Sequence, residues 1–384
     1  MPASEPIVPF LSAVPEQEVA ELRDRVASAR FPNQLAGAGW EYGTELGCLA
    51  RLAEYWRDEY DWAIHEARIN RLQQFTTTVD GQLLHFVHHR SGRPGAFPIV
   101  LLHGWPGSIV EFLDVAALLV DPVPDRGAGT EPFDLVIPSL PGFGFSGPTL
   151  RPGWHPRRIA SALVDLMARL GYDRYGVQGG DWGSIVAANM ADLDPDHVAG
   201  LHVNFLSLPR PRDETGDPTP EEAARQAATA RWQATESGYS AIQGTKPQTV
   251  GYALEDSPVG LCAWIVEKFR SWSDCGGDVE RSFTRDQLLT NVCLYWFTRT
   301  AASSARIYYE MRNAGGGAVP QRRIAVPTGV ANYPAEVART PRRWAERRYN
   351  ITWWKDMPKG GHFAAMEVPE LFAADVAGFF ATVR

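Results

Sequence analysis

Gly179-Gly180-Asp181-Trp182-Gly183 decides the fold of this chain, because it joins a short apolar strand to an apolar helix. The strand is predicted over residues 175–178 and the helix over residues 184–190. Small residues around one charged side chain are typical of the strained strand–turn–helix junction that presents a nucleophile. The usual Ser position holds Asp181, an anion suited to displacement at an sp³ carbon bearing a strained or good leaving group. A plain turn with a helix-capping Asp is the alternative.

The sequence around this junction alternates short strands and helices. Apolar runs at residues 99–102, 133–137 and 175–178 are typical of fully buried strands, and an amphipathic helix is predicted over residues 158–170. Such alternation predicts a mostly parallel sheet flanked by helices. We therefore expect an α/β fold in which residues 96–206 and 319–384 form the core, with strands resuming at 323–330 and 351–354. Residues 207–318 contain helical patterns alone after a proline-rich loop, and we expect them to form an inserted helical lid.

Residues 1–95 form an N-terminal extension that we expect to pack on the core and the lid. A short amphipathic helix is predicted from Pro15 to about residue 31, and a second helical stretch over residues 45–71. Two strands follow, joined by an Asp80-Gly81 hairpin turn. The second strand carries three histidines without a carboxylate in metal-ligand spacing, and we interpret them as surface residues: His85, His88 and His89.

A histidine partner for Asp181 should follow it in the chain, because junctions of this kind order the triad as nucleophile, acid and histidine. Only His197, His202 and His362 qualify, and the first two fall near the following helix end and strand. His362 lies on a glycine-rich loop after the strand at 351–354, which is where a triad histidine belongs. The sequence therefore predicts His362 as the base.

The acid of the triad should come from the end of the preceding strand. Glu336 is the carboxylate offered there, in the segment 330–336, and Asp356 is the competitor six residues before the histidine. A third element is the loop His103-Gly-Trp-Pro-Gly-Ser108, directly after the strand at 99–102. Its backbone, together with the residue after the nucleophile, predicts an oxyanion hole made by the amides of Trp105 and Trp182.

Composition narrows the class of partner. The 384 residues carry 37 Lys and Arg against 45 Asp and Glu, a net charge of −8, which argues against a sequence-independent nucleic-acid binder. The four cysteines lack metal or redox spacing, the N-terminus has no signal pattern, and the longest apolar run, residues 115–120, is too short to span a membrane. A soluble, cytoplasmic protein that binds a small molecule is expected. Trp, Tyr and Phe number 13, 12 and 17, enough to line an apolar pocket as well as a core.

The chain resembles the epoxide hydrolases of the microsomal type, which have the α/β-hydrolase fold and an N-terminal extension. The resemblance covers nearly the whole chain and rests on several segments: residues 103–108, 139–146, 180–184, 245–247, 256–260, 290–291 and 360–365. It implies that Asp181 is the nucleophile, His362 the base and Glu336 the charge-relay acid. It also implies two ring-opening tyrosines in the lid, Tyr239 and Tyr308, although Tyr309 adjoins the latter and keeps that assignment open. Mammalian members carry an N-terminal membrane anchor, whereas this chain begins in the extension.

The resemblance implies hydrolysis of an epoxide by water to a vicinal diol, without cofactor or metal. Tyrosines protonated at neutral pH would donate to the epoxide oxygen while Asp181 forms an ester, which water activated by His362 would then hydrolyse. Aromatic side chains in neighbouring segments are expected to line the substrate pocket and favour an aryl epoxide: Phe143, Trp232, Trp264 and Phe363.

Two other functions are weighed against epoxide hydrolysis. A haloalkane dehalogenase also has Asp followed by Trp at the junction, but that family has Asn after His-Gly in the oxyanion loop and needs no tyrosine pair. A non-catalytic binding protein on the same scaffold would typically have lost a triad member, and none is missing here. Ala- and Arg-rich usage indicates a bacterial gene, and the resemblance extends to bacterial members of enediyne antibiotic biosynthesis. Whether the chain forms a homodimer is left open.

Overall fold

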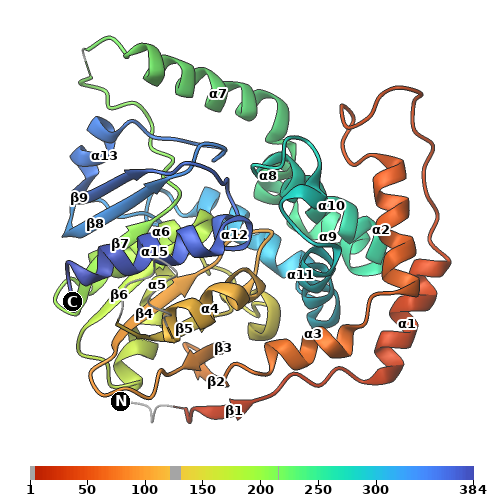
Figure 1. The fold of residues 1–384 in the computed structure, drawn as a ribbon, viewed down its shortest axis with the longest axis horizontal. Coiled ribbons are helices and arrows are strands. Elements are labelled where there is room, and N and C mark those ends of the chain that lie inside the picture. Colours follow the sequence, from red (N-terminus) through yellow and green to blue (C-terminus); the bar gives the residue numbers. More distant parts are fainter. Residues whose placement is uncertain (1–4, 122–130, 215) are drawn as a thin grey trace.

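A single mixed sheet organises the computed structural model, which describes residues 5–121, 131–214 and 216–384 (Figure 1). Within these ranges the strand order is β1-β2-β3-β5-β4-β6-β7-β8-β9. Strands β4 to β9 run parallel to one another, whereas β1, β2 and β3 form antiparallel pairs that extend the sheet beyond β5. The bounds are β1 Val8–Phe10, β2 Gln74–Val79, β3 Gln82–His89, β4 Phe97–Leu102, β5 Phe133–Pro138, β6 Tyr175–Gly179, β7 Val198–Val203, β8 Ile324–Asn332 and β9 Tyr349–Asp356.

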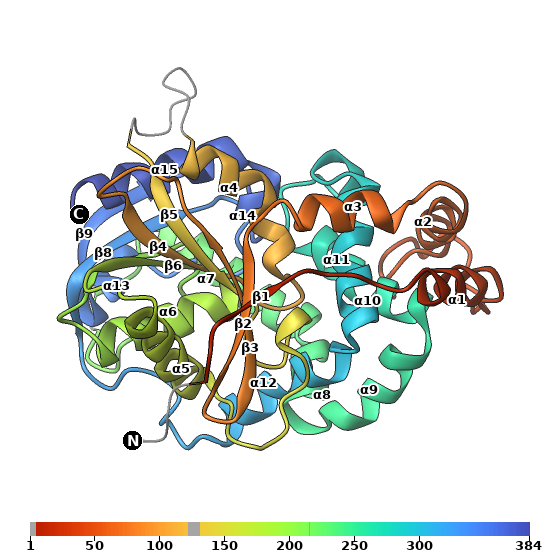
Figure 2. The same ribbon diagram turned by 90° about the horizontal axis from the view of Figure 1, so that it is seen from below.

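Helices cover both faces of this sheet (Figure 2). One face carries α4 (Leu113–Val120), α14 (Ala364–Glu367) and α15 (Pro369–Ala381), and the other carries α5 (Pro156–Arg169) and α6 (Asp181–Leu193), with α13 (Arg342–Arg348) against β9. Helix α15 approaches the sheet closely because glycines lie beneath its phenyl rings. A Cβ at Gly176 would come within 2.3 Å of Phe380, and one at Gly329 within 2.8 Å of Phe379. The predicted sheet with flanking helices is therefore present.

Between β7 and β8 the described residues form six α-helices, all within the region predicted to be helical. In Figure 1, α8, α9, α10 and α11 lie together at one side of the sheet, whereas α7 lies apart from them above β8 and β9. Capping side chains explain where two of them begin: Thr219 and Glu222 form a capping box before the first, and Thr284 and Gln287 form another before the fifth. Their bounds are α7 Pro220–Glu236, α8 Gly238–Thr245, α9 Pro247–Asp256, α10 Pro258–Ser271, α11 Arg285–Thr298 and α12 Ala301–Asn313.

The N-terminal residues contribute both to the sheet and to the inserted helices. Helix α1 (Glu16–Ala27) begins near the predicted position, but the single helix expected over residues 45–71 is two, α2 (Leu46–Asp58) and α3 (Trp62–Ile69). The chain breaks between them because Asp61 caps α3 by accepting from the Ala63 amide. These helices pack against α10 and α11, and the Tyr60 hydroxyl lies 3.1 Å from the Thr290 hydroxyl.

Two of the histidines interpreted as surface residues are buried. His85 is 0% exposed and lies 3.0 Å from both the Ser139 hydroxyl and the Gln74 amide oxygen. His88 is also buried and contacts the Tyr172 hydroxyl. The interpretation was wrong because β3 is an interior strand, between β2 and β5, and not an exposed hairpin arm. Burial lowers the pKa of His85 to about 3, so it is neutral and structural.

Candidate active site

Asp181 lies at the sharp turn between β6 and α6. Its φ of 45° is in the left-handed region, which costs free energy for any residue other than glycine. The turn is tight enough that glycine is required beside it: a Cβ on Gly183 would lie 2.1 Å from the Leu102 carbonyl oxygen. The strained junction predicted from the sequence is therefore formed, and it directs the Asp181 carboxylate away from the sheet.

The loop after β4 supplies a hydrogen-bond donor to this carboxylate. The Trp105 amide donates to Asp181 Oδ1 at 2.8 Å. The loop can approach this closely because residue 104 is glycine, whose Cβ would lie 2.2 Å from Oδ1. Trp182 occupies the first turn of α6, where backbone N–H groups have no partner inside the helix. Both amides that were predicted to form an oxyanion hole thus lie at Asp181.

His362 connects Asp181 to Glu336. Its Nε2 lies 3.3 Å from Asp181 Oδ2, and its Nδ1 lies 2.7 Å from Glu336 Oε1. Burial alone would lower the pKa of His362, but the carboxylates of Glu336 and Asp181 outweigh it and hold that pKa well above the usual value. The competing acid, Asp356, is 62% exposed and lies 3.4 Å from Arg225. The structure therefore brings Glu336, and not Asp356, to the histidine.

Tyr239 and Tyr308 face each other beside Trp105 and Trp182. The Tyr239 ring stacks on Trp105 at 5.1 Å, and the Tyr308 ring meets Trp182 edge-on at 4.7 Å. The two tyrosine rings are 5.6 Å apart, and both are buried. Tyr309, the alternative to Tyr308, is 41% exposed. Burial, reinforced by the charge of Asp181, raises the pKa of both buried phenols, which keeps them protonated.

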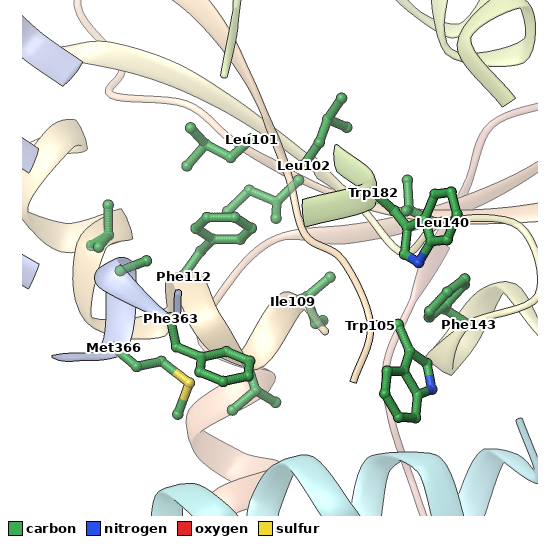
Figure 3. Packing of buried hydrophobic residues seen from close by; sticks show 14 of the residues in the cluster. Leu101, Leu102, Trp105, Ile109, Phe112, Leu140, Phe143, Trp182, Phe363 and Met366 are labelled. Atoms are coloured by element: carbon green, nitrogen blue, oxygen red, sulfur yellow. The ribbon is translucent and has the colours of Figure 1, made fainter. Parts of the chain in front are cut away.

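The four aromatic residues predicted to line the pocket are placed differently from one another. Trp232 and Phe363 contact Trp272, at ring distances of 6.2 and 6.3 Å. Phe143 is buried against His103 and appears beside Trp105 and Trp182 in Figure 3. Among the described residues no ring contact joins Trp264 to this group, and its indole N–H donates to the Gln243 side chain instead.

Sequence reasoning missed two residues of the site, Trp272 and Glu111. Trp272 contacts the rings of Tyr239 and His362, 5.1 and 5.0 Å away, and its carbonyl accepts from the His362 amide at 2.9 Å. No motif in the sequence points to Trp272, and only the large number of tryptophans in the chain suggested that some of them line the site. Glu111 follows Ser108 at capping-box spacing, a pattern that indicates a helix start and not a catalytic site.

Glu111 lines a small cavity together with Asp181 and His362. The centre of a water molecule has about 10 Å³ in which to move there, which is room for one molecule. Gly107 makes space for the Glu111 carboxyl group, since a Cβ at that position would lie 1.7 Å from Oε1. Burial, with a smaller effect of the Asp181 charge, raises the pKa of Glu111 to about 8, so the group is mainly neutral at pH 7.

No helix of the described residues is both long and apolar enough to cross a membrane.

The chain is similar to known proteins along most of its length. A family model described as epoxide hydrolase N terminus matches residues 7–112, and one described as alpha/beta hydrolase fold matches residues 98–257, which confirms the predicted fold class. Epoxide hydrolase 1 of Oryctolagus cuniculus is 36% identical over 416 residues, covering 99% of this chain and 90% of the rabbit protein. The crystal structure of juvenile hormone epoxide hydrolase from the silkworm Bombyx mori has a TM-score of 0.91 at 33% identity, covering 99% of this chain and 95% of that one. The structure of Aspergillus niger epoxide hydrolase has a TM-score of 0.88 at 30% identity, covering 100% and 98%.

Proposed function

Because the chain belongs to the microsomal-type epoxide hydrolases, enzymes that act on epoxides, we propose that it converts an aryl-substituted epoxide to a vicinal diol through an ester on Asp181. One observation carries the proposal. The Asp181 carboxylate lies between an amide donor and a histidine, and two protonated tyrosines belong to the same aromatic cluster. A nucleophile, proton donors and a base are the groups that two-step epoxide hydrolysis requires.

The first step opens the epoxide ring. Asp181 Oδ1 is held by the Trp105 amide, so Oδ2 is the oxygen that attacks a ring carbon. The C–O bond of the ring breaks as the new ester C–O bond forms. The departing oxygen is stabilised by hydrogen bonds from Tyr239 and Tyr308 and takes a proton from one of them. Their raised pKa values favour this role, because the phenols remain protonated until the more basic alkoxide develops.

Ester formation changes the charge around His362. In the free enzyme the Asp181 carboxylate helps to raise the pKa of the imidazole, which favours its protonated form. An ester at Asp181 carries no charge, so this contribution disappears and the pKa of His362 falls. Glu336 still raises the pKa, but less charge now holds the proton on the imidazole. His362 gives this proton to the phenolate that ring opening has left, and the neutral imidazole can then act as a base.

The second step hydrolyses the ester. His362, oriented by Glu336 at 2.7 Å, takes a proton from water, and the water oxygen attacks the ester carbonyl carbon. The amides of Trp105 and Trp182 stabilise the oxyanion. As this intermediate collapses, the C–O bond to the substrate breaks and the departing oxygen takes the proton from His362, which releases the diol. The carboxylic acid that remains gives its proton to His362, which restores the Asp181 carboxylate, now containing the water oxygen. The small cavity beside His362 has room for that water.

A row of adjacent aromatic rings supports an aryl substituent on the substrate. Trp105, Tyr239 and Trp272 form consecutive ring contacts of 5.1 Å beside the proposed reaction centre, and such surfaces favour flat apolar groups. The resemblance to bacterial members of enediyne antibiotic biosynthesis supports a cytoplasmic enzyme that serves the assembly of a natural product. Fast turnover of small aliphatic epoxides relative to aryl epoxides would contradict the aryl assignment.

A single-turnover reaction tests the mechanism. Enzyme in excess over styrene oxide is allowed to react in ¹⁸O-water, and the peptide containing Asp181 is analysed by mass spectrometry. We expect one ¹⁸O atom in Asp181 and none in the diol, and we expect His362→Gln to accumulate the unhydrolysed ester. Label found in the diol alone would mean that water attacks the epoxide directly. Halide release from chloroalkanes without turnover of any epoxide would favour a dehalogenase.

A further inference from the structure

A buried lysine lies among the aromatic rings of the site. Lys268 belongs to the last turn of α10 and is 5% exposed, although lysine is rarely buried. A cation near the C-terminus of a helix is favourable, but an exposed lysine would interact with the helix dipole as well. Burial of its ammonium group costs free energy, which contacts with its neighbours must offset.

The Lys268 ammonium group lies over the ring of Tyr239. Its Nζ is 4.8 Å from the centre of that ring and 5.8 Å from the centre of the Trp272 ring. Both distances are within the roughly 6 Å over which a cation is attracted to an aromatic face. In the part of the chain that the structure describes, no cation lies over the Tyr308 ring. The two proposed proton donors therefore differ in their electrostatic surroundings.

Titratable neighbours also distinguish the two phenols. Burial is the largest cause of the raised pKa of each, and the charge of Asp181 adds to it. The hydrogen bond between the two hydroxyls lowers the pKa of Tyr239 and raises that of Tyr308. Glu267 raises the pKa of Tyr239, but this carboxylate also pairs with the Lys268 ammonium group. Apart from the contribution of Glu267, these contacts favour Tyr239 as the phenol that ionises first.

Ring opening places a negative charge on one of the tyrosines. As the Asp181 ester forms, the O–H bond of a phenol breaks, a new O–H bond forms on the epoxide oxygen, and a phenolate remains. Resting on the function proposed above, we propose that Lys268 is a positioning residue whose charge stabilises the phenolate at Tyr239, so that Tyr239 gives up the proton and Tyr308 donates only a hydrogen bond. A fixed charge beside developing charge is effective here because burial excludes the water that would screen it.

Removing the charge tests the proposal. Lys268→Met keeps an unbranched side chain of similar length, and the rate of ester formation from styrene oxide is measured under single-turnover conditions. We expect this rate to fall about 10- to 30-fold, as the loss of a desolvated cation–aromatic contact would cause. Lys246→Met, at an exposed lysine of the inserted helices, is the matched control and should leave the rate unchanged. An unchanged rate in Lys268→Met would overturn the proposal.

Two further variants separate the effect of charge from a structural effect. In a Tyr239→Phe background the ring remains but cannot ionise, so adding Lys268→Met should slow the reaction no further. Glu267→Gln breaks the same ion pair but removes a negative charge, so it should not slow ester formation. If Lys268→Met slowed the reaction equally with and without Tyr239→Phe, or if Glu267→Gln slowed it as much, the lysine would only hold α10 in place and the proposal would be overturned.

A titration without epoxide separates this inference from the proposed function. The phenol of 2,3,5-trifluorotyrosine is more acidic than that of tyrosine, so in place of Tyr239 its ionisation can be followed by ¹⁹F NMR. Lys268→Met should raise the pKa of this phenol, with an acid dissociation constant about tenfold lower than in the protein that retains Lys268. Such a difference supports the inference even if no epoxide is hydrolysed. Equal titration curves contradict it even if styrene oxide is hydrolysed.

Discussion

Two carboxyl groups pack against the loop of residues 103–108, and each occupies space that is free because a residue of this loop is glycine. Asp181 lies where a Cβ on Gly104 would be, and Glu111 lies where a Cβ on Gly107 would be. Burial is the main cause of the raised pKa of Glu111, and repulsion by the nearby Asp181 carboxylate adds to it. Glu111 is therefore mainly protonated at neutral pH, and the site does not have to hold two neighbouring anions.

A carboxyl group with a raised pKa makes stability depend on pH in a defined direction. In the unfolded chain Glu111 ionises near pH 4.5, whereas in the folded protein it remains neutral until about pH 8. Between these values the unfolded state loses its proton first, so this residue lowers the free energy of unfolding as the pH rises. The glutamine side chain of the Glu111→Gln variant carries no charge at any pH in this range. We expect the variant to match the wild type at pH 4 and to exceed it by on the order of 2–4 kcal/mol at pH 8 in urea unfolding.

Glu370→Gln, at an exposed glutamate on α15, is the control for this measurement and should show no such gain. A Glu111→Gln variant that differs from the wild type equally at both pH values would show that Glu111 titrates like an exposed glutamate.

The sequence could predict the site residues that directly follow a strand, because their order in the chain and the ends of the strands determine where they lie. Asp181, His362 and Glu336 each follow a strand of a parallel sheet, and the carboxyl ends of such strands meet at one edge. Glu111 and Trp272 could not be found in this way. Their place in the site depends on packing between segments distant in sequence. Trp272, for example, directly follows α10 and contacts His362, which is 90 residues later in the chain.

At the scale of elements, α12 separates two adjacent tyrosines. Successive residues of a helix point about 100° apart, so Tyr308 faces Trp182 while Tyr309 points toward solvent. The sequence alone could not choose between them, because the burial of this helix follows from its packing on α8 and α9. The same limit explains the helix expected over residues 45–71, where the pattern did not show the break before α3.

Ring opening should respond to these tyrosines separately. Removing one hydrogen bond to a developing alkoxide costs about 10²-fold in rate, so Tyr308→Phe and Tyr239→Phe should each slow formation of the Asp181 ester by about that factor. Tyr309→Phe is the matched control and should leave the rate unchanged. Stopped-flow quenching of intrinsic fluorescence with styrene oxide would follow the step. If Tyr309→Phe proved the slower variant, the assignment of the second tyrosine would be reversed.

At the scale of the whole molecule, the N-terminal residues join two parts of the structure. Strands β1 to β3 extend the sheet that carries Asp181 and His362, while α1, α2 and α3 pack against the inserted helices. Polar contacts reinforce this second interface, including the Tyr55 hydroxyl bonded to Asp286 at 2.7 Å. Since the inserted helices carry Tyr239 and Tyr308, this arrangement stabilises the position of the proposed proton donors relative to Asp181, the proposed nucleophile.

Weakening α2 should therefore loosen the inserted helices before the sheet. Leu52 is 4% exposed on α2, and replacing a buried leucine by alanine costs about 2–5 kcal/mol. We expect Leu52→Ala to increase hydrogen exchange in α10 and α11 and to leave exchange in β4, β6 and β7 near the wild-type level. Local opening of the inserted helices breaks fewer contacts than opening of the sheet does. Leu35→Ala, at a 59% exposed leucine of the same N-terminal segment, is the matched control and should change neither region. An equal loss of protection in the helices and the sheet would show instead that the molecule opens as one cooperative unit, and that the N-terminal helices do not act on the inserted helices separately.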